Sequence, residues 1–582
     1  MQIKKTLSKL LVNLFRPHPR QLAGCLKLIQ LFLLLLPLSA VAQNTYLPQD
    51  DKANILMERM EIKSRTDSLF NFSKTKPYTR QSAVNAVSHY LQQQGNQSLS
   101  KVDAYNVQRL MLNNLEWIPA ADRLKYVSKR PILKRFYTSP ANLYEVHIKD
   151  FDLVINPVIQ FVVSKEKGNS ETLYLNTRGL TLRGRIANKI GFFTYLTDNQ
   201  EKDPFYVRDW VNKRKAVPGE GFYKQFKLTG YDYFDARGYF TFNVTKYINV
   251  AFGYDKNFIG NGYRSMFLGD NSNSNLFLKI NTRIWKINYQ NLFMELHSAT
   301  IPGGDQLIPK KYAAIHHLDI SITKWLNVGL FEGVIFGRKD RFDFGYLNPI
   351  IFYRSIEQQN GSFDNSLAGL DLKANLFKKI QLYGQLCLDE FVLSQITKNN
   401  GYWGNKWGVQ LGGKYIDAFG IKNLDLQGEF NVVRPYTYSH NDSVANYTHY
   451  NQPLAHPLGA NFSEFIGIAR YQPAPKWLAV AKMIYYSQGR DSDSISYGSN
   501  IFLINVPPYR VGDFGHTLGS GWKTNVLYIS FLLSYEFREN LFLELNAVYR
   551  KQETKTAPII STNPSIISFG LRWNMHRREF DY

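Results

Sequence analysis

A short basic turn between two strands of alternating hydrophobicity recurs along the chain, and this repeat limits the possible folds more than any other feature. In its clearest copy, residues 244–254, Lys246 lies in the turn and an alternating strand leaves it at once. Seven further copies begin at Ala187, Ile284, Ile322, Phe377, Ile421, Pro475 and Phe537. Longer polar, aromatic and Gly-rich connections separate the copies. Short turns on one side and long loops on the other are typical of an up-and-down barrel.

The eight short turns also predict how many strands the barrel has. If both ends of the sheet lie on the short-turn side, eight short turns require nine long loops and therefore 18 strands. An even number of antiparallel strands with short periplasmic turns is the pattern of outer-membrane barrels. The predicted fold is an all-β membrane protein, an 18-stranded antiparallel transmembrane β-barrel preceded by a small α-helical periplasmic module.

Single strands show the alternation directly. In residues 541–550, Leu541, Leu543, Leu545, Ala547 and Tyr549 share one face, and Phe542, Glu544, Asn546, Val548 and Arg550 share the other. The first face is expected to contact lipid. Because only every second residue does so, the mean hydropathy stays low, at −0.30. Aromatic residues make up 15% of the chain and suit the girdles at the two membrane interfaces.

The predicted strands cover most of the chain after residue 150. They lie near 152–165, 172–186, 189–198, 238–245, 247–255, 276–285, 287–296, 312–323, 325–337, 366–377, 380–391, 406–418, 424–437, 460–472, 477–487, 522–537, 541–551 and 564–575. The long connections near 199–237, 256–275, 338–365, 438–459 and 488–521 are expected to be extracellular or folded into the lumen.

The N-terminal part has a different character. Residues 1–42 hold six Lys or Arg, no acid, an apolar run over 28–38 and an Ala-x-Ala motif, which predicts a cleaved signal peptide. An uncleaved anchor helix is the alternative, but the run is about half the roughly 20 residues that a membrane span needs. Helical spacing of apolar residues within 43–140 predicts a periplasmic module of three short helices, and the barrel is expected over 141–582.

The last predicted strand carries an independent signal. Residues 568–575 resemble the C-terminal assembly signal of outer-membrane barrels, with a glycine at 570, an aromatic residue at 573 and an apolar residue at 575. This similarity predicts recognition by the barrel-assembly machinery. Seven residues, 576–582, extend past the signal.

Charge and cysteine content narrow the class of partner. Without residues 1–42 the net charge falls from +23 to +17, and Cys387 is the single remaining cysteine, so no intramolecular disulfide can form. No helix-turn-helix, zinc-finger or RNP pattern accompanies the basic charge, which argues against nucleic acid. We expect anionic partners instead, namely lipopolysaccharide in the outer-membrane lipid and surface polysaccharide.

Charged residues on the predicted inward face bear on whether the lumen is open. They are Arg183, Arg185, His317, Asp319, Asp371, Lys373, Asp425, Glu429 and Glu544. In a porin they would tune ion selectivity, whereas in an obstructed barrel they would pair with one another and with folded-in loops. We favour the obstructed barrel because the connection 199–237 is long and basic enough to plug a lumen.

Three segments resemble a particular family of outer-membrane barrels. Residues 260–271, 344–357 and 382–391 together resemble the capsule-assembly Wzi-like outer-membrane proteins, and are most similar to the gliding-motility proteins of the RemB type. The resemblance covers most of the chain after residue 42. It implies an 18-stranded barrel with a periplasmic helical module, a lumen obstructed by loops and a role in holding surface polysaccharide.

Tyr-Arg dipeptides in long loops are the candidate ligand-binding residues. They are Tyr263 and Arg264, Tyr353 and Arg354, and Tyr509 and Arg510, and Tyr206, Arg208 and Trp210 invite the same interpretation. A ring that stacks on a sugar beside a guanidinium that binds a uronate carboxylate would be a recognition pair. An interface girdle or internal salt bridges would account for the same residues.

No motif predicts catalysis, a metal site or a cofactor. His316 and His317 lie in the middle of a strand, and neither Gly-x-Ser-x-Gly nor His-Glu-x-x-His occurs. The sequence therefore predicts a non-enzymatic barrel in the outer membrane of a Gram-negative bacterium. It would bind or organise capsular or exopolysaccharide, in gliding motility or adhesion, and the alternative is a porin-like channel for small solutes.

Overall fold

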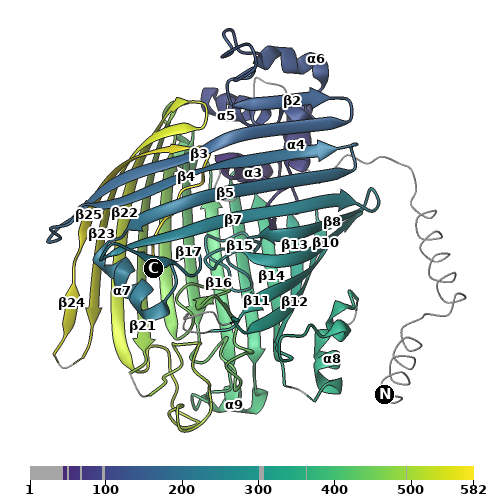
Figure 1. The fold of residues 1–582 in the computed structure, drawn as a ribbon. Coiled ribbons are helices and arrows are strands. Elements are labelled where there is room, and N and C mark those ends of the chain that lie inside the picture. Colours follow the sequence, from purple (N-terminus) through teal and green to yellow (C-terminus); the bar gives the residue numbers. More distant parts are fainter. Residues whose placement is uncertain are drawn as a thin grey trace, which may run out of the picture.

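The computed structural model shows a closed antiparallel barrel (Figure 1). It describes residues 44–48, 52–65, 69–94, 99–299, 307–350, 352–361, 363–492, 495–556 and 558–582, so the predicted signal peptide lies outside the described residues. The wall consists of β3 (Phe151–Glu166), β4 (Leu173–Ile186), β5 (Ile190–Lys202), β7 (Gly230–Asn243), β8 (Ile248–Asp255), β10 (Asn275–Ile284), β11 (Ile287–His297), β12 (Lys310–Thr323), β13 (Leu326–Phe336), β14 (Asn365–Leu376), β15 (Ile380–Glu390), β16 (Lys406–Tyr415), β17 (Leu424–Val433), β20 (Phe462–Tyr471), β21 (Trp477–Arg490), β22 (Trp522–Arg538), β23 (Leu541–Thr554) and β25 (Ser565–Trp573).

These 18 strands confirm the predicted strand number. Each pairs with its neighbour in sequence, and β25 pairs with β3 to close the barrel, with Trp573 opposite Ile159. Three shorter strands extend the rim: β2 (Tyr144–Ile148) pairs with β3, β6 (Lys224–Phe226) with β7, and β24 (Ile560–Thr562) with β23. The largest error in a predicted boundary is at β7, which begins at Gly230 rather than at residue 238. With the end of β5, α7 and β6, 25 of the 39 residues of the predicted connection 199–237 are strand or helix.

The two rims of the barrel differ in the length of their connections. At the short-turn end, tight turns join strand pairs such as β4 and β5, where Ala187 and Asn188 both have positive φ, and β14 and β15, where Phe377 and Lys378 do. Two successive residues of positive φ make a turn whose twist matches that of the flanking strands. The connections that leave the strands at the long-loop end contain α7 (Phe205–Arg214), η4 (Phe344–Leu347), α8 (Tyr353–Gln359) and α9 (Leu393–Lys398).

The wall alternates as the sequence predicts. Leu545, Phe531 and Phe569 are exposed on the outer face, while Asp371 and Lys373 are buried on the inner face. An apolar outer face and a polar inner face are what a lipid environment requires of a barrel strand. Among the described residues, no helix has both the length and the apolar character needed to cross a membrane.

Small helices precede the barrel, as predicted. They are α3 (Lys52–Ser64), α4 (Arg80–Gln94) and α5 (Lys101–Leu112), followed by η2 (Leu115–Trp117), α6 (Ala120–Arg123) and η3 (Leu124–Tyr126). The Ser100 side chain caps α5 by accepting a hydrogen bond from the Asp103 amide, at 3.0 Å. Apolar faces of α3, α4 and α5 form a core of their own around Met60, Val87 and Leu110. We call residues 44–126 the helical module.

Candidate functional site

The helical module is joined to the inner wall by buried ion pairs. Lys74 Nζ lies 3.2 Å from Asp319 and also pairs with Asp371, and Lys373 pairs with Glu61. All of these side chains are almost fully buried. Since removing one partner would leave an uncompensated buried charge, such pairs hold the module firmly against the wall.

A second set of ion pairs lies where α3 meets the short turns. Arg59 pairs with Asp417 at 2.9 Å and also with Asp425, and Glu58 lies 2.9 Å from Lys414. Burial alone would raise the pKa of Glu58, but Lys414 and Lys76 outweigh it and lower that pKa to about 2. The carboxylate therefore stays charged, and this docking contact persists at neutral pH.

The loop between β8 and β10 enters the lumen and meets the helical module inside the barrel. Its short strand β9 (Phe258–Ile259) pairs with β1 (Thr75–Lys76) of the module. The Gly260 amide donates to the Lys74 carbonyl at 2.7 Å, and the Asn261 side chain donates to Ser73 at 3.0 Å. Segments that enter from opposite rims are thus hydrogen-bonded to each other in the lumen.

The loop between β17 and β20 fills the lumen beside it. It contains a hairpin of β18 (Thr448–His449) and β19 (Gln452–Pro453). The hydroxyl of Tyr447 donates to the Phe267 carbonyl at 2.7 Å, and that of Tyr438 donates to the Met266 carbonyl at 2.8 Å. The Phe267 ring stacks on Phe331 of the wall with centroids 4.3 Å apart. The largest buried apolar cluster of the protein therefore lies inside the barrel.

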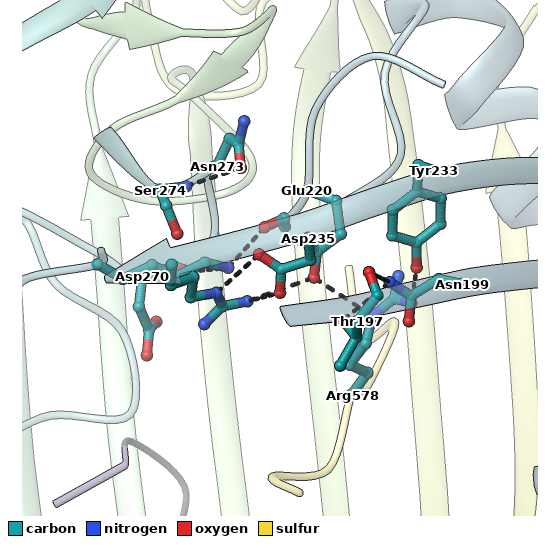
Figure 2. Close-up of polar contacts among 12 residues, drawn as sticks. Thr197, Asn199, Glu220, Tyr233, Asp235, Asp270, Asn273, Ser274 and Arg578 are labelled. Atoms are coloured by element: carbon teal, nitrogen blue, oxygen red, sulfur yellow. Dashed lines mark hydrogen bonds and ion pairs between the residues drawn. The ribbon is translucent and has the colours of Figure 1, made fainter. Parts of the chain in front are cut away.

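The C-terminal segment 576–582 turns back into the lumen instead of leaving the barrel (Figure 1). Arg578 Nη1 lies 2.9 Å from Glu201 and also binds the Tyr233 hydroxyl, as Figure 2 shows. Asp581 lies 3.0 Å from Arg264 and 2.7 Å from Lys482. We call residues 576–582 the C-terminal tail.

Two adjoining groups extend this ionic network. Arg237 on β7 pairs with Asp235 at 2.7 Å. Glu220 lies 3.7 Å from both Arg237 and Arg578, and Figure 2 shows Glu220, Asp235 and Arg578. Although burial would raise the pKa of Asp581, Arg264 and Lys482 hold it well below its usual range. The tail is therefore anchored by charged groups from the wall and from two loops.

These contacts confirm that the inward charges pair with one another and with segments folded into the barrel. The partners of the residues not yet described are Glu116 for Arg183, Asp152 for Arg185, Asp371 for His317, the backbone amides of Tyr263 and Arg264 for Glu429, and Arg572 and Arg577 for Glu544. The expected plug, 199–237, supplies only α7 and its following turn. The loops 256–275 and 434–461, the helical module and the C-terminal tail supply the rest.

The structure places most of the candidate ligand-binding residues in internal contacts. Tyr263 binds Asp581 and Lys482, and Arg264 binds Asp581, so this pair anchors the tail. The Tyr206 hydroxyl donates to the Phe580 carbonyl at 2.6 Å.

The other two residues of α7 are also engaged. The ring of Trp210 lies 5.6 Å from that of Tyr582, and Arg208 pairs with Glu171 at 2.7 Å. The five candidates in these two segments therefore make internal contacts, and they do not form an exposed pair of a ring and a guanidinium that a ligand could bind.

The two remaining Tyr-Arg dipeptides each expose one member. Tyr353 is fully buried against His316, while Arg354 is exposed and pairs with Glu357 at 2.6 Å. In the last dipeptide the arrangement is reversed: Tyr509 is 48% exposed and Arg510 is buried. Tyr509 and Arg354 are thus the candidates that a ligand could reach, and their role as ligand contacts stays a prediction.

Arg510 belongs to an aromatic cluster at the long-loop end that the sequence analysis missed. Its guanidinium lies 4.1 Å from the Trp403 ring centroid, and Tyr402 lies 5.7 Å from Phe514, which is 55% exposed. Burial and the nearby guanidinium of Arg510 lower the pKa of His516 at the cluster's edge, so this imidazole is neutral at pH 7. Adjacent tyrosine and tryptophan between two glycines, at 401–404, were the available signal.

We call Tyr402, Trp403, Tyr509, Arg510 and Phe514 the loop-face cluster. It joins the β15–β16 and β21–β22 connections, which are about 100 residues apart in sequence. Exposed rings held on a rigid base can stack on a flat apolar partner while their rims remain hydrated. Within the described residues, no group of three or more His, Cys, Asp or Glu side chains could hold a metal ion.

The fold is similar to that of known outer-membrane barrels. Wzi, an outer-membrane protein involved in group 1 capsule assembly in Escherichia coli and a carbohydrate-binding β-barrel, superposes with a TM-score of 0.53 at 12% identity, over 92% of this chain and 100% of Wzi. OprD from Pseudomonas aeruginosa gives 0.39 at 9% identity, over 73% of this chain and 96% of OprD. No family model and no curated protein sequence matches the chain.

Proposed function

We propose that this protein is a non-enzymatic outer-membrane barrel of a Gram-negative bacterium that holds capsular or exopolysaccharide at its long-loop end, in gliding motility or adhesion. In this proposal residues 1–42 are a cleaved signal peptide, and the barrel-assembly machinery recognises the last strand. The short-turn end and residues 43–140 face the periplasm. The similarity to RemB-type proteins in the sequence supports the motility role.

The filled lumen is the observation that carries this proposal. A porin needs a water-filled path through the barrel. Here the β1–β9 pairing joins segments from opposite rims, and the C-terminal tail occupies part of the remaining space. A barrel closed in this way can act through its surface but not as an open channel, which favours binding over the porin-like alternative.

The loop-face cluster is the part of that surface best suited to a polysaccharide. Tyr509 and Phe514 are about half exposed, and the buried guanidinium of Arg510 stacks on the neighbouring Trp403 ring. Sugar rings offer apolar faces to aromatic side chains and hydroxyl groups to the surrounding polar atoms. The net positive charge of the chain also favours an acidic polymer.

The test measures binding of cell-surface polysaccharide, extracted from the source organism, to the purified protein in detergent. We expect the double variant Tyr509→Ala, Phe514→Ala to bind at least about tenfold more weakly, a loss of about 1.4 kcal/mol. Phe569→Ala, which removes an equally exposed ring from the lipid-facing wall, is the matched control and should bind like the wild type. Equal binding by all three proteins would exclude the loop-face cluster, and no binding by the wild type would refute the proposed function.

A further inference from the structure

The connection between β13 and β14 lies on the outer face of the wall, neither in the lumen nor free above the rim. On β12, the Lys311 side chain enters the lumen, where it donates to Asn446 at 2.7 Å, so the even-numbered residues of this strand face outward. Tyr353 of α8 covers one of these, His316, with ring centroids 3.9 Å apart. Figure 1 shows α8 beside β12, outside the barrel.

This segment covers a row of polar side chains on the outer face. Asn291, His316 and Glu332 are direct register partners across β11, β12 and β13. The Arg354 amide donates to Glu332 at 3.1 Å. Within the described part of the chain, Asn291 Oδ1, His316 Nε2 and the Tyr353 hydroxyl are buried without a hydrogen-bond partner. A polar row of this kind would be unfavourable against lipid, and the segment separates it from the surroundings.

The covered row lies deep in the wall. His316 is six residues from the long-loop end of β12, or about 15 Å at a rise of about 3.3 Å per residue and a tilt of about 40°. The whole strand spans about 33 Å, and an apolar band is about 25 Å tall. Even if all of the excess protruded at the long-loop end, His316 would lie about 7 Å inside the band. Tyr289, whose hydroxyl donates to the Pro349 carbonyl at 2.5 Å, is two residues from the short-turn end of β11.

The opposite side of the same segment exposes large apolar side chains. Phe344 is 79% exposed, Ile350 85% and Phe352 76%. In water such a group of rings and aliphatic side chains would be strongly disfavoured. Their backbone is continuous with a segment that packs on the lipid-facing wall. We therefore expect these side chains to have the same apolar surroundings as the wall.

We propose that the apolar side of this segment lies in the membrane, where Phe344, Ile350 and Phe352 contact the acyl chains of the leaflet at the long-loop end. The segment replaces lipid over the polar row and supplies a new apolar surface in its place. Its inner side is fixed by polar contacts, since Glu357 also accepts a hydrogen bond from Ser366 on β14 at 2.8 Å. This inference rests on the proposed outer-membrane location, and it adds a lipid-binding element to the surface of the barrel.

Nitroxide accessibility tests the inference on the full chain in liposomes. Cys387, the single cysteine after residue 42, is fully buried, so a spin label can be attached to Phe352→Cys without removing it. Phe531→Cys on the lipid-facing wall is the membrane reference, and Phe514→Cys on the loop-face cluster is the aqueous reference. We expect the label at 352 to collide several-fold more often with oxygen than with a water-soluble nickel complex, as the label at 531 does.

Two outcomes would count against the inference. If the label at 352 resembles the one at 514 while the one at 531 is in lipid, the segment is in water and the inference fails alone. If the label at 531 is also in water, the outer-membrane location fails as well. Ile350→Cys provides an independent position should the variant at 352 not fold, and it must give the same lipid signature.

Discussion

Replacing Gly369 with alanine tests how tightly the lumen is packed. Gly369 lies on the inner face of β14, and the ring of Phe267, from the loop between β8 and β10, occupies the space next to it. A Cβ atom at this position would lie 2.3 Å from Phe267 Cε1, 2.6 Å from Cζ and 2.9 Å from the Leu386 carbonyl oxygen. Normal contact requires more than 3.4 Å, so the ring must move by about 1 Å or more.

The ring has no free space into which it can move. Phe267 is fully buried and stacks on Phe331 with an interplanar angle of 4°. Overpacking of a close-packed core costs about 1–3 kcal/mol. We therefore expect Gly369→Ala to lower the free energy of unfolding by about 2 kcal/mol, despite the small gain from replacing a strand glycine.

Guanidinium unfolding of the protein in detergent micelles, followed by tryptophan fluorescence and circular dichroism, measures this loss. Gly428→Ala is the matched control, because Gly428 is also in a wall strand but a Cβ there would meet nothing within 4 Å. The control should be as stable as the wild type or slightly more so. If Gly369→Ala were as stable as Gly428→Ala, the lumen would be loosely filled and the reasoning would be refuted.

Three further predictions follow from the buried charges and from the thiol of Cys387. Arg578→Ala leaves Glu201 without its main cation, so carboxypeptidase should remove the C-terminal tail at least tenfold faster than from the wild type; an unchanged rate would show that the tail is not held by this pair. Because the pKa of Glu58 in the folded protein is about 2 and the ordinary value is about 4.5, the stability from its contact with Lys414 is complete above about pH 4.5 and is lost as the pH falls toward 2; the thermal midpoint should therefore drop over this window, and less so in Glu58→Gln. Cys387 should resist maleimide in the folded protein and react fully after denaturation, and rapid labelling of the folded protein would contradict its burial.

The strands could be predicted from sequence because lipid imposes a rule on every second residue. The start of β7 was not predicted because the alternation of apolar and polar residues breaks down there. Asp232 faces outward and accepts a hydrogen bond from Gln200 instead of contacting lipid. A strand that continues beyond the apolar band no longer shows the alternation. The connection 199–237 was therefore predicted to be longer than it is.

The filling of the lumen was predictable only in part. Charged residues on the inner face indicated an obstructed barrel. The local sequence, however, does not predict that Arg264 pairs with Asp581, which is 317 residues away. The two arginines and two carboxylates of the C-terminal tail were visible in the sequence and are what an ion-paired segment needs. The place of η4 and α8 on the outer wall depends on His316 and Glu332 being neighbours across two strands, which is known only once the register is known.

Conductance across a planar lipid bilayer tests the central claim most directly. With the helical module, two loops and the C-terminal tail in the lumen, the wild-type protein should insert without producing steady channels, while a variant lacking residues 256–275 should conduct. Steady, large single-channel currents from the wild type would mean that water fills the barrel, and the account of a closed, surface-binding barrel would be wrong.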